Sequence, residues 1–132
     1  MAVDSWDPSA SGEPSELDVA RLCLASAHLE MADFGLSVHE IARLAPFARQ
    51  QGAVDWAQLA QGLEPDQIVA LVKLFTLAES TFPAWEAGPR SPVVPLVALL
   101  KSRGAYPGEL TRWIKANTSN RFLPHGSLMD RL

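Results

Sequence analysis

The side chains that most often bind metal ions are few in this sequence, and their spacing matches no known metal site. They are His28, His39, His125 and Cys23. His39 and Glu40 begin like the helix of a zinc peptidase, which carries a second histidine four residues after the first. Arg43 occupies that position. We therefore expect no metal and no cofactor.

Nucleophilic catalysis and nucleotide binding also lack their usual patterns. Cys23 lies in an apolar stretch with Arg21 as its one basic neighbour, away from the helix N-terminus that lowers a thiol pKa. It is interpreted as a small core residue. Ser127 lies outside the strand–turn–helix context of a nucleophile elbow, and the scattered glycines form no phosphate-binding loop. The sequence predicts no enzymatic activity.

Two stretches, 85–92 and 113–126, combine aromatic, arginine and amide side chains that suit a peptide or an anion. Arginine pairs with carboxylates, and tryptophan and arginine are enriched at the energetic centres of protein interfaces. The candidate partner-binding residues are Trp85, Arg90, Trp113, Arg121, Phe122 and His125. The structural alternative is that proline, glycine and asparagine form turns here, while the aromatic side chains hold loops against the core.

Charge is divided unevenly along the chain, although the net charge is only −4. Residues 1–88 carry 13 acidic and 4 basic side chains, whereas residues 89–132 carry 2 acidic and 7 basic ones. A basic surface in the second part would attract an acidic protein or a phosphate backbone. The alternative is that these cations face acidic groups within the fold or are ordinary solvated side chains.

The elements that would position these residues begin after an acidic arm. Residues 1–15 are rich in serine, proline and acidic residues and are expected to be disordered, because they bury too little apolar surface to offset their ordering entropy. Trp6 is the exception, since it has the surface to dock on the domain or on a partner. Residues 16–132 are expected to form one helical domain.

Apolar residues at three- and four-residue steps, with caps and glycine stops, predict the helices. The expected segments are 16–33, 37–44, 55–61, 65–78, 91–103 and 107–115. In the first, the apolar face consists of Leu17, Ala20, Leu24, Ala27 and Met31, and Gly35 follows as the stop. The segment 65–78 has the most regular stripe and is the predicted central helix.

Several boundaries rest on single residues. Ser37 and Glu40 have capping-box spacing, whereas Pro46 predicts a kink or a break and Gly52 the end of that unit. The loop 81–91 is expected to pack down through Phe82 and Trp85. The mixed apolar and basic residues 121–132 are expected to lie on the core or on another chain.

The fold class is therefore all-α, a compact bundle of five or six helices. No stretch alternates with the period of a strand, and none is long and apolar enough to span a bilayer. The sequence shows no secretory signal, and its single cysteine fits a reducing cytoplasm.

The ending TRWIKANTSNRFLPHGSLMDRL, with the upstream WEAGPRSPV, is similar to small uncharacterised helical proteins of Gram-negative bacteria. The resemblance covers about residues 82–132 and implies a bacterial protein, but no activity and no site residues. Residues 37–44 also resemble the first helix of a helix-turn-helix protein. Pro46 and Phe47 stand where the tight turn is expected, and the following helix has few basic residues for phosphate contacts.

Together these features favour a non-enzymatic, regulatory protein–protein interaction module in the cytoplasm, with a basic and aromatic C-terminal surface. Its expected partner is a protein with an acidic surface, and a second copy of the chain is another candidate. The alternative is a nucleic-acid-binding protein that uses the basic second part. An enzyme with a site assembled from distant residues is a third hypothesis.

Overall fold

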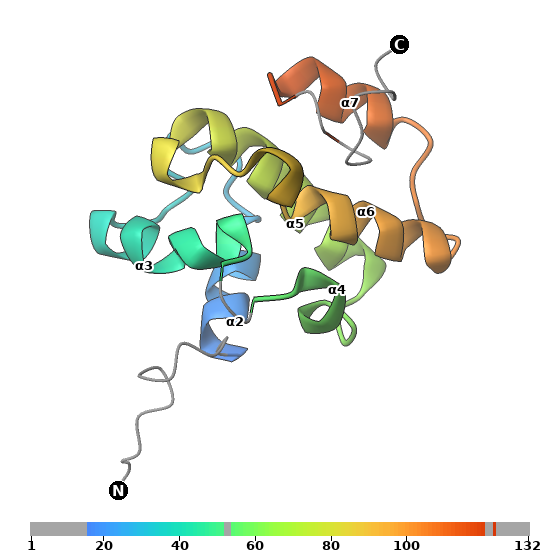
Figure 1. Ribbon diagram of the computed structural model, residues 1–132, viewed down its shortest axis with the longest axis horizontal. Coiled ribbons are helices and arrows are strands. Elements are labelled where there is room, and N and C mark those ends of the chain that lie inside the picture. Colours follow the sequence, from blue (N-terminus) through green and yellow to red (C-terminus); the bar gives the residue numbers. More distant parts are fainter. Residues whose placement is uncertain (1–15, 52–53, 121–122, 124–132) are drawn as a thin grey trace, which may run out of the picture.

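A computed structural model describes residues 16–51, 54–120 and 123, and this part of the chain contains helices and turns but no strand. The fold is a helical bundle, as expected (Figure 1). Its α-helices are α2 (Glu16–Ala25), α3 (Val38–Arg49), α4 (Trp56–Leu59), α5 (Pro65–Thr81), α6 (Val93–Ser102) and α7 (Leu110–Asn117). Two 3₁₀ turns, η2 (Pro83–Trp85) and η3 (Gly88–Arg90), connect α5 to α6. The expected disorder of residues 1–15 lies outside the described residues.

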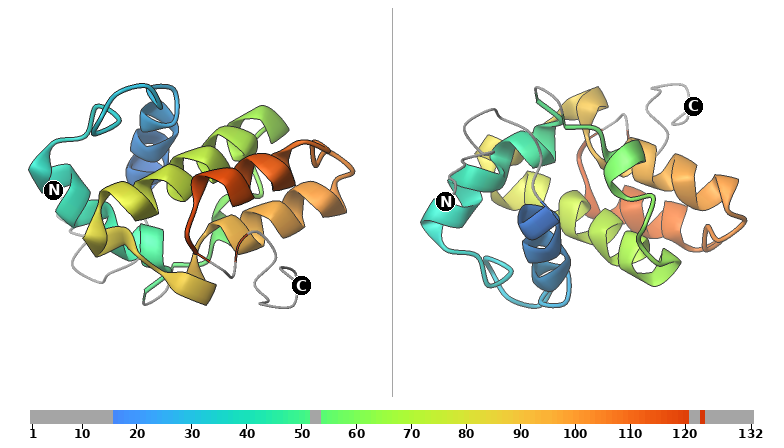
Figure 2. Two further views of the ribbon diagram at one scale, coloured as in Figure 1. Left: turned by 90° about the horizontal axis from the view of Figure 1, so that it is seen from above. Right: turned by 90° about the horizontal axis from the view of Figure 1, so that it is seen from below.

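Helix α5 is the central helix, which confirms the prediction from its apolar stripe. Pro65 occupies its first turn, and the Gln67 side chain accepts a hydrogen bond from the Glu64 backbone N–H at 2.9 Å. The helix contacts α2, α6, α7 and η2, and α7 runs alongside it (Figure 2). Because it has neighbours on several sides, α5 buries a wide face.

An aromatic series fills the centre of the bundle. It comprises Phe34, Phe82, Trp85, Phe75 and Trp56, whose neighbouring ring centroids are 5.1–6.1 Å apart. Trp56 and Trp85 are fully buried, and their indole N–H groups donate to the carbonyl oxygens of Phe47 and Ile41, both at 2.8 Å. Burial and hydrogen bonding together fix these two rings. The expected packing of the 81–91 loop is confirmed.

Helix α2 ends at Ala25, well before the position near Asp33 that its sequence predicts. Residues 26–36 form turns, in which Phe34 and Gly35 have positive φ angles of 57° and 76°. The Ser26 hydroxyl donates to the Cys23 carbonyl at 2.6 Å and competes with continuation of the helix. These turns reverse the chain so that Phe34 and Leu36 reach the core.

The apolar face predicted for this helix is also wrong. Leu22 and Ala25 are fully buried, whereas Leu17 and Leu24 are 81% and 61% exposed. The sequence offers two apolar stripes on the same helix, and the structure buries the one that contains Leu22 and Ala25. A leucine-rich face therefore points outward.

Helix α3 continues through Pro46 to Arg49, so of the two outcomes predicted for Pro46, a kink or a break, the break does not occur. Proline removes one backbone donor, but Phe47 and Ala48 are buried and hold the last turn in place. The chain leaves this helix at Gln50, which has a left-handed φ of 50°. The expected end at Gly52 lies outside the described residues. The capping box of Ser37 and Glu40 is confirmed.

The remaining boundaries agree with expectation to within a turn. Asp55 caps α4 by accepting from the Ala57 N–H, and Gly62, which follows the expected segment 55–61 and was to end it as a left-handed stop, has no positive φ. Gly104 has a φ of 67° and ends α6 as expected. Helix α7 begins at Leu110, one turn later than Pro107.

Candidate functional site

The two stretches that the sequence singled out meet at a buried carboxylate that sequence reasoning missed. Asn120 Nδ2 donates to Glu79 Oε1 at 3.1 Å and to the Gly88 carbonyl at 2.9 Å. The Ala87 N–H donates to the same Glu79 oxygen at 3.2 Å. We call Glu79, Ala87, Gly88, Ser91 and Asn120 the Glu79 cluster. It joins α5 to the loop before α6 and to the turn after α7.

Glu79 is only 7% exposed, and burial raises the pKa of its carboxyl above the usual 4.5. Hydrogen bonds from Ser91, Ala87 and Asn120 favour the charged form and oppose this shift, whereas the nearby charge of Glu86 adds to it. The groups that donate these hydrogen bonds, the Ser91 hydroxyl, the Ala87 N–H and the Asn120 amide, are all neutral. The sequence feature that could have indicated Glu79 is its position on the buried face of α5, four residues after Phe75.

Trp85, a predicted partner contact, is a core residue instead. Its side chain is fully buried between Phe75 and Phe82, and its N–H is occupied by the Ile41 carbonyl. It has no surface to offer a partner in this structure. The physical reason is that the loop packs both of its aromatic side chains inward, which was the structural alternative for this stretch.

Arg90 is exposed, but its guanidinium lies at the end of α3. Its side chain donates to the carbonyl oxygens of Arg49 and Gln50, and the Gln50 amide donates back to the Arg90 carbonyl at 2.8 Å. A cation next to the last carbonyls of a helix is favourable for both the hydrogen bonds and the helix dipole. Arg90 therefore has a structural role, which does not depend on any partner.

Trp113 is half-buried against the core, so part of its side chain remains at the surface. The ammonium of Lys73 lies 5.3 Å from the centre of its ring, a cation–π distance. Beside them is an open hollow of about 60 Å³, lined by Val69, Lys73, Pro107, Glu109, Leu110 and Trp113. We call these residues the Trp113 surface. The hollow is well below the roughly 300–1,000 Å³ of small-molecule sites.

The other three predicted contact residues, Arg121, Phe122 and His125, lie outside the described residues. Between them Leu123 is fully buried, and its N–H donates to the Asn120 carbonyl at 3.2 Å. The chain thus returns to the core three residues after the Glu79 cluster. Lys73 belongs to the Trp113 surface but was missed, because only the three-dimensional structure brings α5 beside α7.

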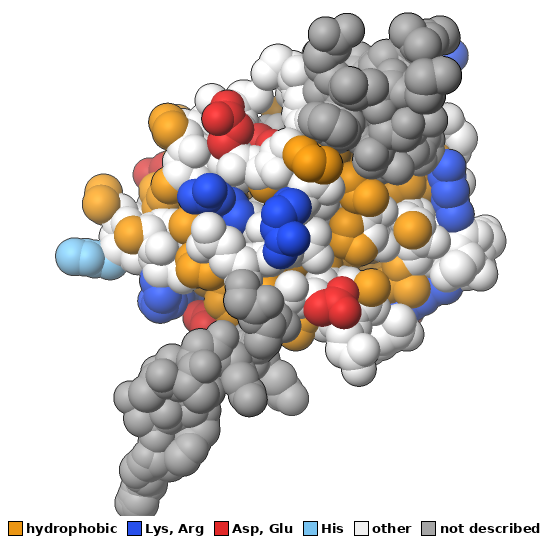
Figure 3. All heavy atoms as spheres, viewed as in Figure 1, with side chains coloured by type: hydrophobic (Ala, Val, Ile, Leu, Met, Phe, Trp, Pro, Cys, Tyr) orange, Lys and Arg blue, Asp and Glu red, His pale blue; other side chains and the backbone are white. Residues whose placement is uncertain are grey.

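Basic side chains of the second part are partly used inside the fold. Arg103 donates to the carbonyl oxygens of Gln61 and Leu63, both at 2.7 Å, and Lys101 lies 5.1 Å from the centre of the Tyr106 ring. On the face in Figure 3, the Lys and Arg side chains lie as separate spots among apolar and uncharged groups. Part of the uneven charge along the chain therefore serves to hold the two parts together.

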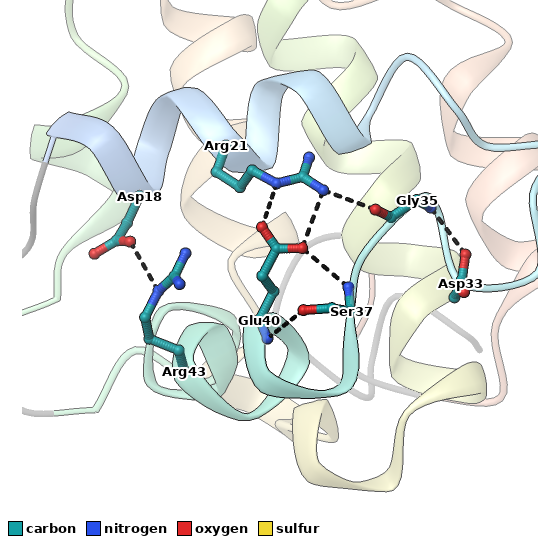
Figure 4. A network of polar contacts seen from close by, with 7 residues as sticks. All are labelled: Asp18, Arg21, Asp33, Gly35, Ser37, Glu40 and Arg43. Carbon is teal, nitrogen blue, oxygen red and sulfur yellow. Dashed lines mark hydrogen bonds and ion pairs between the residues drawn. The ribbon is translucent and has the colours of Figure 1, made fainter.

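A second polar cluster connects α2 to α3 (Figure 4). Arg21 contacts both Glu40 oxygens, at 2.6 and 3.2 Å, and donates to the Gly35 carbonyl, while Arg43 contacts Asp18 at 3.2 Å. The hydrogen bond from Arg21, aided by the backbone of Ser37, lowers the pKa of Glu40 to about 2. Each oxygen of Glu40 already has a partner, so this cluster is structural.

The residues considered for catalysis do not assemble in the described part of the chain. There, no three His, Cys, Asp or Glu side chains are grouped as metal ligands. His28 and His39 are exposed, and Cys23 is half-buried, with burial raising the pKa of its thiol. A raised thiol pKa disfavours the reactive thiolate. The position at which a helix-turn-helix motif would need its turn is helical, since α3 continues without interruption past Leu44.

Comparison with known proteins adds no further constraint. The chain matches no protein-family model, no curated protein and no solved structure. Within residues 16–51 and 54–120, no helix combines the length and hydrophobicity needed to cross a bilayer.

Proposed function

We propose that this chain is a non-enzymatic protein–protein interaction module whose contacts centre on the Trp113 surface. The observation that carries the proposal is a half-exposed tryptophan beside a lysine and a small hollow. Tryptophan is enriched among residues that dominate binding energy, and such residues fill or flank small pockets. The hollow accommodates a side chain of a partner more readily than a whole metabolite.

The proposed partner is a bacterial cytoplasmic protein with an acidic segment. Lys73 offers it a cation next to an aromatic ring, and Arg112 is exposed on the neighbouring helix. Arg121, Phe122 and His125 remain part of the proposed contact set, because they lie within five residues of Asn120 and Asn120 is held beside α5. Charge of this kind mainly accelerates association and selects partners.

Affinity capture with quantitative mass spectrometry tests this proposal. Wild type is compared with Lys73→Glu and Arg112→Glu, which reverse charge at the proposed surface, and with Arg121→Glu/Phe122→Ala. The matched control is Arg49→Glu, which reverses an exposed charge on α3. We expect the specific partners to be lost from the first variants and retained by the control. The same partners in every sample would refute the proposed surface.

Nucleic-acid binding is the second candidate, and the 7 basic against 2 acidic residues of 89–132 favour it. Titration with a random DNA duplex at about 50 mM salt would then give binding that weakens steeply as salt is added, because each phosphate contact releases counterions. Absence of binding at that salt removes the candidate. The contacts of Arg90 and Arg103 argue against nucleic-acid binding, since their guanidinium groups already donate to backbone carbonyls.

A further inference from the structure

Helix α2 presents a second apolar face to solvent. Leu17 and Leu24 are 81% and 61% exposed, and Ala20 between them is exposed as well. Residues three, four and seven apart share one side of a helix, so these three form a continuous strip, which we call the α2 outer face. Met31, in the turns that follow, is 44% exposed. Leu17, Leu24 and Met31 are three of the four large apolar side chains that are exposed in the described part of the chain.

This face is held in a fixed orientation. On the opposite side of α2, Leu22 and Ala25 are fully buried. On its flank, Arg21 contacts Glu40 at 2.6 Å and Asp18 contacts Arg43 at 3.2 Å, so α3 fixes the rotation of the helix (Figure 4). The outward leucines therefore cannot turn inward without breaking both ion pairs. An exposed apolar strip with a fixed orientation is suited to binding another apolar group.

We propose that the α2 outer face is the docking site of Trp6 from the same chain. Residues 1–15 directly precede α2, and Trp6 is their only aromatic residue. An extended ten-residue connection spans up to about 33 Å, whereas Leu17 and Leu24 are only about 10 Å apart along the helix. Trp6 can therefore reach every part of the strip once the chain reverses, and Gly12 and Pro14 supply residues suited to a turn.

Area favours this tethered occupant over a second copy of the chain. One tryptophan side chain buries about 150–250 Å², which matches two leucines and an alanine. A stable contact between separate chains needs about 1,200–2,000 Å². Because Trp6 is tethered next to the strip, its effective concentration there is in the millimolar range, and a small contact is sufficient.

Charge around the strip favours the same occupant. Residues 1–15 contain Asp4, Asp7 and Glu13 and no lysine or arginine. The side chain of Arg43, which contacts Asp18 next to Leu17, is 52% exposed. Asp4 and Asp7 flank Trp6 closely, so docking of the indole brings a carboxylate toward this guanidinium. Apolar and charged groups of the arm thus match groups that lie together on α2 and α3.

Nuclear magnetic resonance of the full 132-residue chain tests the proposal. Trp6→Ala assigns the signals of the Trp6 ring. In wild type we expect nuclear Overhauser cross-peaks between that ring and the methyl groups of Leu17 and Leu24. Leu24→Asp should abolish them, whereas the control Val38→Asp, which changes an 80%-exposed apolar residue on α3, should retain them. Circular dichroism verifies that both variants fold.

The outcomes are distinct from those of the capture experiment, since the two surfaces share no residue. Cross-peaks that do not depend on concentration and are lost only in Leu24→Asp support the proposal. Absence of cross-peaks in wild type overturns it. Cross-peaks found only between chains, in a mixture of labelled and unlabelled protein, also overturn it and assign the α2 outer face to a second copy.

Discussion

The Asn120 side chain donates to the buried carboxylate of Glu79 at 3.1 Å, across 41 positions of sequence. Through the same nitrogen it reaches the Gly88 carbonyl, so one amide connects α5, the loop before α6 and the end of α7. Buried polar groups of this kind are stable only when they are hydrogen-bonded. The position of the chain after α7 therefore depends on the charge state and hydrogen bonds of Glu79.

Glu79→Gln should change how stability depends on pH. Burial raises the pKa of Glu79 in the folded state, so the folded protein binds this proton more readily than the unfolded chain does. Stability conferred by this group is present at low pH and is lost as pH rises from about 4.5 through the raised pKa. Urea unfolding at a series of pH values should show this loss in wild type but not in Glu79→Gln.

The control for that measurement is Glu86→Gln, which retains Glu79 as a titrating group. Because the charge of Glu86 contributes to raising the pKa of Glu79, this variant should still lose stability as pH rises above about 4.5, but the loss should be smaller and should end at a lower pH than in wild type. Identical pH profiles for wild type and Glu79→Gln would contradict the assignment.

Glu40→Gln should remove a loss of stability that occurs as pH falls, whereas the loss that depends on Glu79 occurs as pH rises. Hydrogen bonding to Arg21 lowers the pKa of Glu40 to about 2 in the folded state. Its contribution is present above the usual pKa of 4.5 and is lost as pH falls from there toward about 2. Wild type should therefore lose more unfolding free energy over this range than Glu40→Gln, whose amide oxygen still accepts from the Ser37 N–H. Glu30→Gln is the control, and equal losses in wild type and Glu40→Gln would refute the prediction.

Arg103→Ala should destabilise the fold through lost contacts to carbonyl groups near α4. The guanidinium donates to Gln61 and Leu63, both at 2.7 Å, and to Ala60 at 3.4 Å. Because the side chain is exposed, we expect the free energy of unfolding to fall by about 1 kcal/mol, which is less than hydrogen bonds to charged groups usually contribute. Chemical denaturation of Arg103→Ala and of the control Arg112→Ala measures this difference. Equal stability of the two variants would show that the contacts contribute nothing measurable.

Trp85→Ala should be far more damaging than Trp113→Ala. Trp85 is fully buried with its N–H bonded to Ile41, and truncating such a side chain costs about 3–5 kcal/mol. Trp113 is only half-buried, so Trp113→Ala should lower the free energy of unfolding by less than Trp85→Ala does. It should, however, reduce partner binding. Thermal unfolding and the capture experiment together separate the two roles. A partner-binding defect in Trp85→Phe, without loss of stability, would instead make Trp85 a contact residue.

Features with local causes were predictable from the sequence. Ser37 and Glu40 satisfy each other within one turn, Pro65 suits a first helical turn, and Gly104 supplies the left-handed angle that ends α6. The stripe of α5 is regular because one helix packs against several neighbours at once. None of these inferences required knowledge of distant residues.

Features decided by distant residues were not predictable. Helix α2 carries two apolar stripes, and ion pairs with Glu40 and Arg43 accompany burial of the less obvious one. Pro46 was expected to kink or break the helix, but α3 continues through it, because burial of Phe47 and Ala48 outweighs one lost hydrogen bond. For the site, residue types singled out two stretches as candidate partner contacts, and the structure brings these stretches together at Glu79. The residue types did not reveal Glu79 between them, nor that Arg90 contacts the end of α3.

The contacts of Arg90 and Arg103 can form only after these two residues have been synthesised. Each reaches back about 40 positions, to carbonyl groups near the ends of α3 and α4. Until then, those carbonyl oxygens lack the arginine donors that they have in the folded protein. The first half of the nascent chain therefore reaches its final form only after the loop that follows α6 has left the exit tunnel.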